Sequence, residues 1–165
     1  MIKHIKCDIF ESGADVILHQ VNCQGVMGSG IAKQVKEKYP KVYESYKNRC
    51  DFYSPKALLG SAQFVGTHIE YNTPFVGIFN LFGQEKFGYD GKCYTDYIAL
   101  YKCFEKVKDS LGREIIHSKK ERTIAIPYLM GCHRGGGDWN VVYKMIEEVF
   151  ADSDCEVLIC EYNGG

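Results

Sequence analysis

Residues 19–32 decide the fold of this chain, and they read HQVNCQGVMGSGIA. They begin in the apolar run Val16–Val21, which is typical of a strand covered on both faces. They end in the helical spacing of Ile31, Val35 and Tyr39. Glycines between a buried strand and a helix place flexible backbone at a helix N-terminus, where successive N–H groups can converge on an oxygen anion.

A second glycine-rich stretch occurs in the same context later in the chain. Residues 130–137 read MGCHRGGG and follow the short apolar run Thr123–Pro127. Two such loops suit a diphosphate, although each by itself is also compatible with a plain tight turn. The first loop has the spacing G-x-x-G-x-G, and neither loop ends in Gly-Lys-Ser/Thr, so nucleotide hydrolysis and hydride transfer lose support.

The composition predicts one globular domain over residues 1–165. Hydrophobic residues make up 45% of the chain, charged residues 25%, and the formal net charge is -1. A near-neutral chain has no broad attraction for nucleic acid or for acidic membranes, so an anionic ligand has to be bound locally. We find no signal-peptide pattern and no apolar run of membrane-spanning length, and we therefore expect a cytoplasmic protein without a membrane partner.

Eight cysteines raise the question of a zinc site or a disulfide framework. They contain no C-x-x-C pair, and the adjacency of Cys132 and His133 suits chelation poorly. Cys160 lies in an apolar run, where a free thiol behaves as a small hydrophobic side chain. We expect free thiols, no metal and no cofactor.

Apolar patterning along the chain predicts strands that alternate with helices. A helix from Ile31 is expected to be interrupted or kinked at Pro40. The predicted strands are Ile2–Ile9, Val16–Val21, Ala62–Val65, Phe75–Leu81, Thr123–Pro127 and Glu156–Tyr162, and the other helices are Tyr97–Leu111 and Val141–Phe150. This order predicts a three-layer α/β/α domain with a central mixed sheet of about six strands.

Four segments together resemble a known family. They are Cys7-Asp8-Ile9, residues 19–32, Ile126-Pro127 leading into Gly131-Cys132, and Glu161-Tyr162-Asn163. In these segments the chain is similar to the macro domains, which bind ADP-ribose. Residues 22–32 most resemble the branch that includes the yeast-type ADP-ribose 1''-phosphate phosphatase, the terminal ADP-ribose protein glycohydrolase and the bacterial DNA ADP-ribosyl glycohydrolases.

The resemblance implies a set of ligand contacts. Asp8 and the Ile9 backbone would bind adenine, Tyr162 and Asn163 would flank it, and Asn22 would bind the distal ribose. The residues expected at the phosphates and distal ribose are Gly28, Ser29, Gly30, Ile31, Pro127, Gly131, Cys132, His133, Arg134 and Gly135. Taken without the resemblance, the sequence indicates that Asp8 is a carboxylate facing water and that His133 and Arg134 belong to a solvated loop.

The resemblance also bears on chemistry. Glycohydrolases of this branch work with a Lys after the fourth strand and an Asp in the second glycine loop, but Gln84 and Gly135 stand at those positions here. Glutamine cannot form a Schiff base and glycine cannot move a proton. Lys86 could restore the amine after a shift of one or two residues, whereas nothing in the second loop restores the carboxylate.

The phosphatase pattern fits better. It is matched by His19 before the Asn-Cys pair and by the loop Phe87-Gly88-Tyr89-Asp90. We therefore predict that His19, Asn22 and Asp90 are catalytic residues. The competing interpretations are that His19 is a structural histidine of a buried strand and that Asp90 is a plain turn residue.

Three functions remain open at this stage. The first is a hydrolase that dephosphorylates ADP-ribose 1''-phosphate. The second is a reader that binds ADP-ribose without chemistry. The third is a glycohydrolase that removes ADP-ribose from protein or nucleic acid. The expected partner is ADP-ribose, a derivative of it, or an ADP-ribosylated macromolecule. The lysines of residues 33–47 are better explained as the charged face of a helix than as a nucleic-acid surface.

Overall fold

A computed structural model describes residues 1–113 and 122–162 of the chain. These residues form a six-stranded sheet in the order β1-β6-β5-β2-β4-β3. All neighbouring strands are parallel except β3 and β4, which are antiparallel. The strands are β1 Ile2–Lys6, β2 Val16–Val21, β3 Ala62–Gly66, β4 Gly77–Phe82, β5 Arg122–Pro127 and β6 Cys155–Glu161. The predicted mixed sheet is confirmed.

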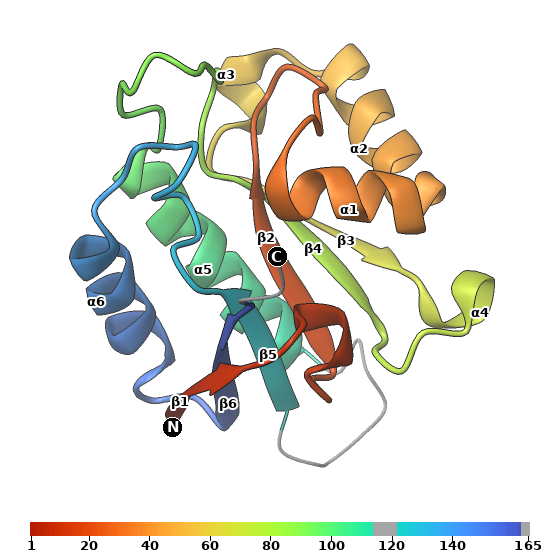
Figure 1. Cartoon of the computed structure of the whole chain (residues 1–165), viewed down its shortest axis with the longest axis vertical. Helices are drawn as coiled ribbons and strands as arrows, with labels where there is room; N and C mark the ends of the chain where they lie inside the picture. Colours follow the sequence, from red (N-terminus) through yellow and green to blue (C-terminus); the bar gives the residue numbers. More distant parts are fainter. Residues whose placement is uncertain (114–121, 163–165) are drawn as a thin grey trace.

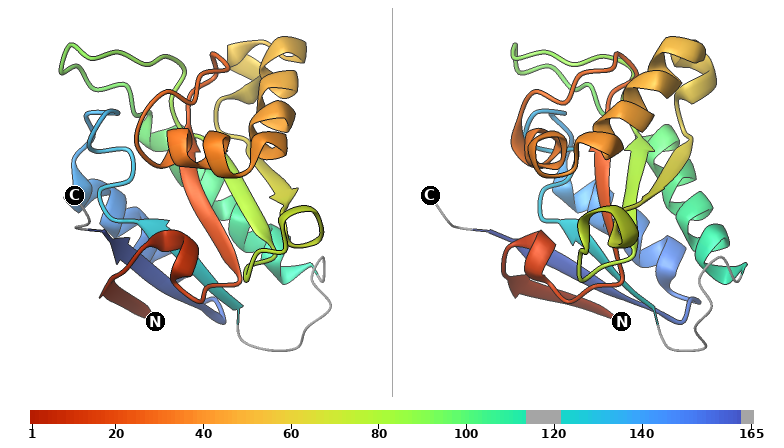
Figure 2. Two further views of the ribbon diagram at one scale, coloured as in Figure 1. Left: turned by 45° about the vertical axis from the view of Figure 1, so that its right-hand side comes forward. Right: turned by 90° about the vertical axis from the view of Figure 1, so that its right-hand side faces the viewer.

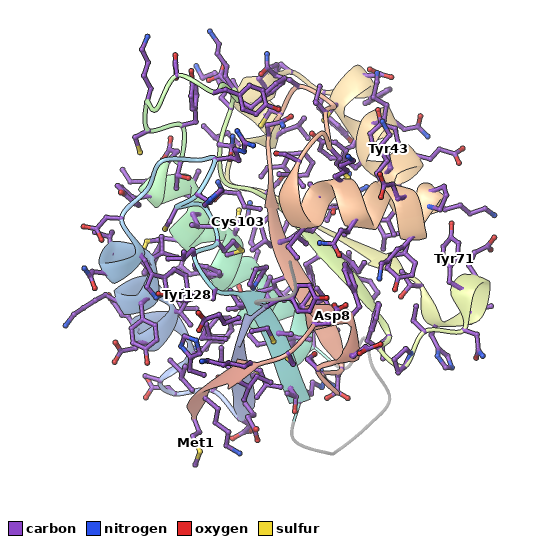
Figure 3. The ribbon with its side chains drawn as sticks, viewed as in Figure 1. Met1, Asp8, Tyr43, Tyr71, Cys103 and Tyr128 are labelled. Atoms are coloured by element: carbon purple, nitrogen blue, oxygen red, sulfur yellow. The ribbon has the colours of Figure 1, made fainter. Side chains whose placement is uncertain are left out.

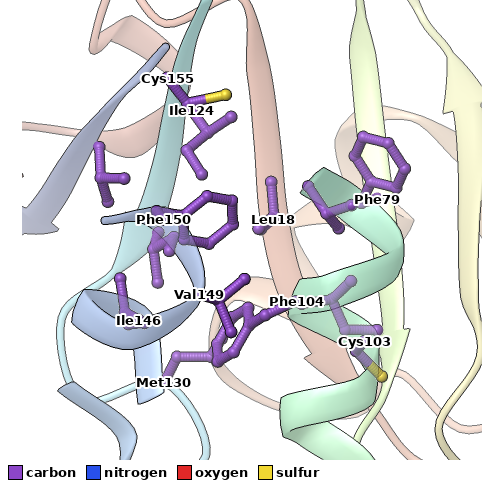
Figure 4. Close-up of a cluster of buried hydrophobic side chains, with 14 of the residues drawn as sticks. Leu18, Phe79, Cys103, Phe104, Ile124, Met130, Ile146, Val149, Phe150 and Cys155 are labelled. Atoms are coloured by element: carbon purple, nitrogen blue, oxygen red, sulfur yellow. The ribbon is translucent and has the colours of Figure 1, made fainter. Parts of the chain in front are cut away.

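Helices cover both faces of this sheet, as the two views of Figure 2 show. On one face, α5 (Tyr97–Gly112) and α6 (Trp139–Phe150) pack against alternate residues of the strands, among them Leu18 and Ile124 (Figure 4). On the other face lie α1 (Gly30–Lys38), α2 (Pro40–Phe52), α3 (Pro55–Leu58) and the 3-10 helix η1 (Ile9–Glu11). The short helix α4 (His68–Tyr71) lies between β3 and β4 along the chain. The structure therefore has the three layers expected from the sequence.

The largest boundary difference from the prediction is in β1. It ends at Lys6 rather than Ile9, because the Asp8 side chain accepts a hydrogen bond of 3.0 Å from the Phe10 backbone N–H and begins η1 there. The predicted interruption at Pro40 is confirmed: α1 ends at Lys38 and Pro40 begins α2, where a first-turn proline loses no intrahelical hydrogen bond. The helices α3 and α4 are too short to show a helical period in the sequence.

The parallel strands carry their following loops to one end of the sheet. The loops after β2, β4 and β5 meet at the upper end of the molecule in Figure 1. In open α/β sheets this carboxyl end is the usual position of a ligand site. Within the described part of the chain, no helix has the length and apolar character needed to cross a membrane.

From the packing of the core we expect truncation of Phe104 to lower the stability of the protein strongly. This side chain is fully buried on α5 and packs edge-on against Phe150, with 6.2 Å between the ring centroids (Figure 4). We expect Phe104→Ala to lower the free energy of unfolding by about 3–5 kcal/mol, measured by urea denaturation. Phe52→Ala is the matched control, since Phe52 is 79% exposed. Equal effects of the two changes would contradict this description of the core.

Candidate functional site

A cavity of about 440 Å³ opens at the carboxyl end of the sheet, a size typical of small-molecule sites. It lies between the loops that follow β2, β4 and β5, and the first turn of α1 forms part of its wall. The lining includes these residues expected from the sequence: His19, Asn22, Gly28, Ser29, Gly30, Ile31, Pro127, Gly131, His133, Arg134, Gly135 and Tyr162. The two glycine-rich loops therefore face one shared cavity.

Four residues expected at the site do not line this cavity: Asp8, Ile9, Asp90 and Cys132. Asp8, labelled in Figure 3 on the turn after β1, is close to the lining residue Tyr162, because the Cys7 N–H donates to the Glu161 carbonyl. The adenine role of Asp8 and Ile9 stays a prediction. Asn163 lies outside the described residues.

The Asp90 side chain does not line the cavity and is hydrogen-bonded within its own loop. Its two carboxylate oxygens each lie 2.9 Å from the Tyr94 hydroxyl, and Oδ1 also accepts from the Lys92 backbone N–H. These hydrogen bonds, with that of Tyr94 the largest, lower the pKa of the Asp90 carboxyl. The catalytic role of Asp90 stays a prediction.

Several lining residues were not predicted. They are Gln20, Val21, Val26, Ala32, Gln34, Gln84, Phe87, Gly88, Tyr89, Tyr128, Leu129, Met130 and Cys160. Phe87 and Tyr89 belong to the loop that matched the phosphatase pattern, and this match was the one signal for them in the sequence. Five others lie within the two glycine-rich stretches that the sequence singled out: Gln20, Val21, Val26, Ala32 and Met130. The rest come to the cavity through sheet register and loop contacts.

Asn22 holds the shape of the first glycine loop. Its Oδ1 accepts from the backbone N–H groups of Gln24 and Val26 and from the Tyr46 hydroxyl, and its Nδ2 donates to the Val26 carbonyl at 2.8 Å. Both ends of the amide are therefore occupied by the protein. The geometry supports a loop-positioning role for Asn22, with at most one amide hydrogen left for a ligand.

The first turn of α1 presents free backbone donors to the cavity. Gly30, Ile31 and Ala32 line the cavity at the start of this helix, and their N–H groups precede the first intrahelical hydrogen bond. Ser29 stands at the N-cap but makes no side-chain capping bond. Unpaired N–H groups at the positive end of a helix dipole are suited to phosphate oxygens.

The second glycine loop also leads into a helix, as the sequence predicted. α6 begins at Trp139, and its N-cap Asp138 accepts a hydrogen bond of 2.9 Å from the Asn140 N–H. This carboxylate caps the first turn of α6, whereas the Ser29 side chain makes no capping bond at α1. The residues of the second loop that line the cavity are Met130, Gly131, His133, Arg134 and Gly135.

Thr95 and Gln20 fix this second loop from the side of the sheet. The Thr95 hydroxyl donates to the Gly131 carbonyl at 2.6 Å, and the Thr95 N–H donates to the Gly135 carbonyl. The Gln20 Nε2 donates to Thr95 Oγ1 and to Gln84 Oε1. This network connects β2, the loop after β4 and the second glycine loop.

The network also occupies the positions at which the glycohydrolase residues were expected. The Gln84 amide is bonded to Gln20 and to the Lys86 carbonyl, and the Lys86 side chain does not line the cavity. A Cβ at Gly135 would lie 2.4 Å from Thr95 Oγ1, so no side chain fits there in this conformation. Among the described residues, no Asp, Glu or Lys lines the cavity.

His19 is a buried histidine of the cavity lining. It is 2% exposed, its Nε2 lies 2.6 Å from Asn80 Oδ1, and its Nδ1 has no partner in the described structure. Removal from water lowers the pKa of the imidazole to about 4, and the hydrogen bond that its Nε2 donates to Asn80 Oδ1 opposes this shift only in part. His19 is therefore a neutral imidazole at pH 7.

Aromatic rings and one cation form the rim of the cavity. The Arg134 guanidinium lies 4.6 Å from the centre of the Tyr89 ring, and Tyr89 packs edge-on against Phe87. This contact joins the loop after β4 to the second glycine loop. Tyr128, labelled in Figure 3, packs against Trp139 of α6. Arg134 is suited to hold phosphate oxygens with its planar set of donors.

The lysines of α1 and α2 already have partners. Lys33, Lys41 and Lys47 form ion pairs with Glu37, Glu70 and Asp51. Lys36 and Lys38 lie over the rings of Tyr43 and Phe10. These contacts support the interpretation of a charged helix face. The part of the chain described here contains no group of three or more His, Cys, Asp or Glu side chains that could hold a metal ion.

Comparisons with known proteins give relatives in sequence and neighbours in structure. No family model matches the chain. It is 28% identical over 98% of its length, and 97% of the relative's, to an uncharacterized 17.5 kDa protein of Enterobacteria phage T4. A DNA ADP-ribosyl glycohydrolase of Thermus aquaticus is 26% identical over 90% of this chain and 37% of its own length. An ADP-ribose 1''-phosphate phosphatase of Aspergillus oryzae is 44% identical over 36% of this chain.

Solved structures share the fold over almost the whole chain. The macrodomain of Mycobacterium tuberculosis DarG superposes with a TM-score of 0.75 at 22% identity, over 98% of this chain and 97% of that chain. Thermosipho africanus DarTG in complex with ADP-ribose gives a TM-score of 0.78 at 20% identity, over 97% of this chain and 41% of that chain. The chain therefore has the macro-domain fold, with a cavity at the carboxyl end of its sheet.

This is the fold that the four sequence segments predicted. The chain spans only about a third of the length of the two named enzymes that it matches, with 37% of the Thermus glycohydrolase and 31% of the Aspergillus phosphatase covered.

The close approach at Gly135 predicts a loss of stability when a side chain is added. We expect Gly135→Ala to lower the free energy of unfolding by about 1–3 kcal/mol, because its Cβ would meet Thr95 Oγ1 and the Gly131 carbonyl. Gly28→Ala is the matched control, since the nearest atom to its Cβ lies 3.5 Å away. Thermal or urea unfolding of both variants tests this, and an unchanged Gly135→Ala variant would contradict the loop geometry.

Burial of His19 predicts an acid-dependent loss of stability. The unfolded chain binds a proton at His19 below pH 6.5, whereas the folded chain binds it only near pH 4. Stability is therefore complete above pH 6.5 and falls as the pH drops toward 4, by roughly 3 kcal/mol. His19→Gln removes this contribution, and the difference between the two urea-unfolding series isolates it from the carboxylates common to both. Parallel pH curves would show that His19 is not buried as described.

Proposed function

We propose that this macro domain binds ADP-ribose, or a derivative of it, in the cavity between its two glycine-rich loops. The free N–H groups of Gly30, Ile31 and Ala32 and the guanidinium of Arg134 are suited to a diphosphate. The names of the related enzymes and the ADP-ribose held by the DarTG structure support this ligand class. The fit of the cavity size to a nucleotide-sized molecule supports it further.

The proposed reaction is removal of the terminal phosphate from ADP-ribose 1''-phosphate. One observation carries it: His19 is a neutral imidazole in the cavity lining whose Nδ1 has no partner in the described structure. A neutral imidazole nitrogen can accept a proton from an attacking water. The lack of lining carboxylates and lysines, within the described chain, argues against the lysine-and-aspartate route of the glycohydrolases.

In this mechanism, water forms the new oxygen–phosphorus bond while its proton passes to His19 Nδ1. The bond between phosphorus and the 1'' oxygen breaks, and the electron pair leaves with that oxygen. Solvent in the open cavity protonates the departing oxygen and takes the proton back from His19, so the products are ADP-ribose and inorganic phosphate. Arg134 stabilises the charge that develops on the phosphoryl oxygens.

A reader function is the second candidate. Its supporting observation is that the polar groups of Asn22, Gln84 and Thr95 form hydrogen bonds that hold the loops, so they are not free to bond a ligand. A rigid cavity rich in backbone donors binds an anion without having to react with it. Such a reader would recognise free ADP-ribose or an ADP-ribosylated macromolecule.

A phosphorus NMR time course on ADP-ribose 1''-phosphate separates these two functions. With the phosphatase we expect shifted diphosphate resonances and growing inorganic phosphate, and His19→Gln should slow phosphate release by about 100-fold or more while still shifting the diphosphate signals. The control is His68→Gln, which changes an exposed histidine of α4.

Shifted diphosphate signals without phosphate release would favour the reader. Phosphate release that His19→Gln leaves unchanged would remove His19 from the mechanism. The absence of any shift would overturn the proposed ligand.

A further inference from the structure

A row of polar side chains crosses the sheet next to the site. His19 on β2 pairs in register with Asn80 on β4, and Asn80 pairs with Gln63 on β3. All three side chains are buried, in a sheet whose other buried positions are largely apolar. Burying three polar side chains is costly unless they bond to one another, and they form one continuous chain of hydrogen bonds.

The direction of these hydrogen bonds is set at the far end of the row. The Ser45 backbone carbonyl on α2 can only accept, and the Gln63 Nε2 donates to it at 3.2 Å. This orients the Gln63 Oε1 toward Asn80, whose Nδ2 donates to it at 3.2 Å. The Asn80 Oδ1 is then turned toward His19 Nε2, 2.6 Å away. An amide oxygen only accepts, so the proton of the imidazole lies on Nε2.

We propose that Asn80 and Gln63 are positioning residues that hold His19 as the Nε2–H tautomer and leave the bare lone pair on Nδ1. Nδ1 is buried and has no partner among the described residues. Buried polar atoms without a partner are rare in proteins, and this one belongs to a residue of the cavity lining.

This arrangement restricts what His19 can contact. A bare Nδ1 repels phosphate oxygens, which also only accept, and it attracts groups that carry a hydrogen, such as a ribose hydroxyl or a water. The role of this nitrogen as a base rests on the proposed phosphatase function. The tautomer itself and the preference for a hydroxyl or water do not, because a reader would use the same lone pair to bind a ribose hydroxyl.

The test is nitrogen NMR of protein labelled with ¹⁵N at histidine, with and without ADP-ribose. In the wild type we expect a pyrrole-type signal for His19 Nε2 and a pyridine-type signal for Nδ1, with the Nδ1 signal moving when ADP-ribose is added. Gln63→Leu removes the acceptor that orients Asn80, so the Nδ1 signal should move toward the pyrrole-type position as the tautomers mix. Gln63→Glu keeps an acceptor oxygen for Asn80 Nδ2 and should restore the wild-type pattern.

If Gln63 contributed only to packing, Gln63→Leu would lower the stability of the protein without changing the tautomer of His19. The nitrogen spectrum therefore separates a positioning role of Gln63 from a merely structural one. If the protein turns over ADP-ribose 1''-phosphate, kcat of Gln63→Leu should fall in proportion to the Nε2–H fraction with KM unchanged. A protonated Nδ1 in the wild type, or an unchanged tautomer in Gln63→Leu, would overturn the proposal. The expected tautomers without phosphate release would instead reject only the phosphatase function.

Discussion

The parallel pairing of β2 with β4 on one side and β5 on the other is the constraint on which the rest of the structure depends. Parallel strands end at the same edge of a sheet, so the loops after β2, β4 and β5 are brought together whatever their own sequences are. The pairing also covers both faces of β2 with helices, which explains its continuous apolar run. A cavity bordered by three loops follows directly from this register.

The loops hold each other through backbone groups and neutral side chains. Asn22 closes the first loop on itself, and Thr95 ties the second loop to the segment after β4. Because these bonds use amides and hydroxyls, the cavity lining contains few ionised groups in the described structure, and Arg134 stands out as its full cation. Such a site recognises its ligand by oriented N–H groups rather than by net charge, which fits a chain with a formal net charge of -1.

The chain is similar to parts of two proteins with different names, a DNA ADP-ribosyl glycohydrolase and an ADP-ribose 1''-phosphate phosphatase. Gln84 and Gly135 occupy the positions where the glycohydrolase resemblance expects Lys and Asp. The structure shows that Gln84 and Gly135 are connected in this chain. Gln84 is bonded to the same Gln20 amide that reaches Thr95, and Thr95 fills the space that a side chain at position 135 would need. The two positions belong to one packed network.

The sequence by itself determined the layers of the fold and the two loops of the site, because both depend on local patterns. Apolar periodicity identified the strands and the helices α5 and α6, and the glycine spacing identified residues 22–30 and 131–137 as loops. The early end of β1 came from the capping contact of Asp8, which periodicity does not report, whereas the start of α2 was marked in the sequence by Pro40.

Only the tertiary structure decided which polar groups are free to act. Asn22 and Asp90 are ordinary candidates in the sequence, but one is occupied by its own loop and the other by Tyr94. His19, Asn80 and Gln63 lie far apart along the chain and meet because the register of three strands aligns them. The physical reason is that hydrogen-bond partners and burial are properties of contacts between distant segments, whereas periodicity and turn preferences are properties of neighbours in the chain.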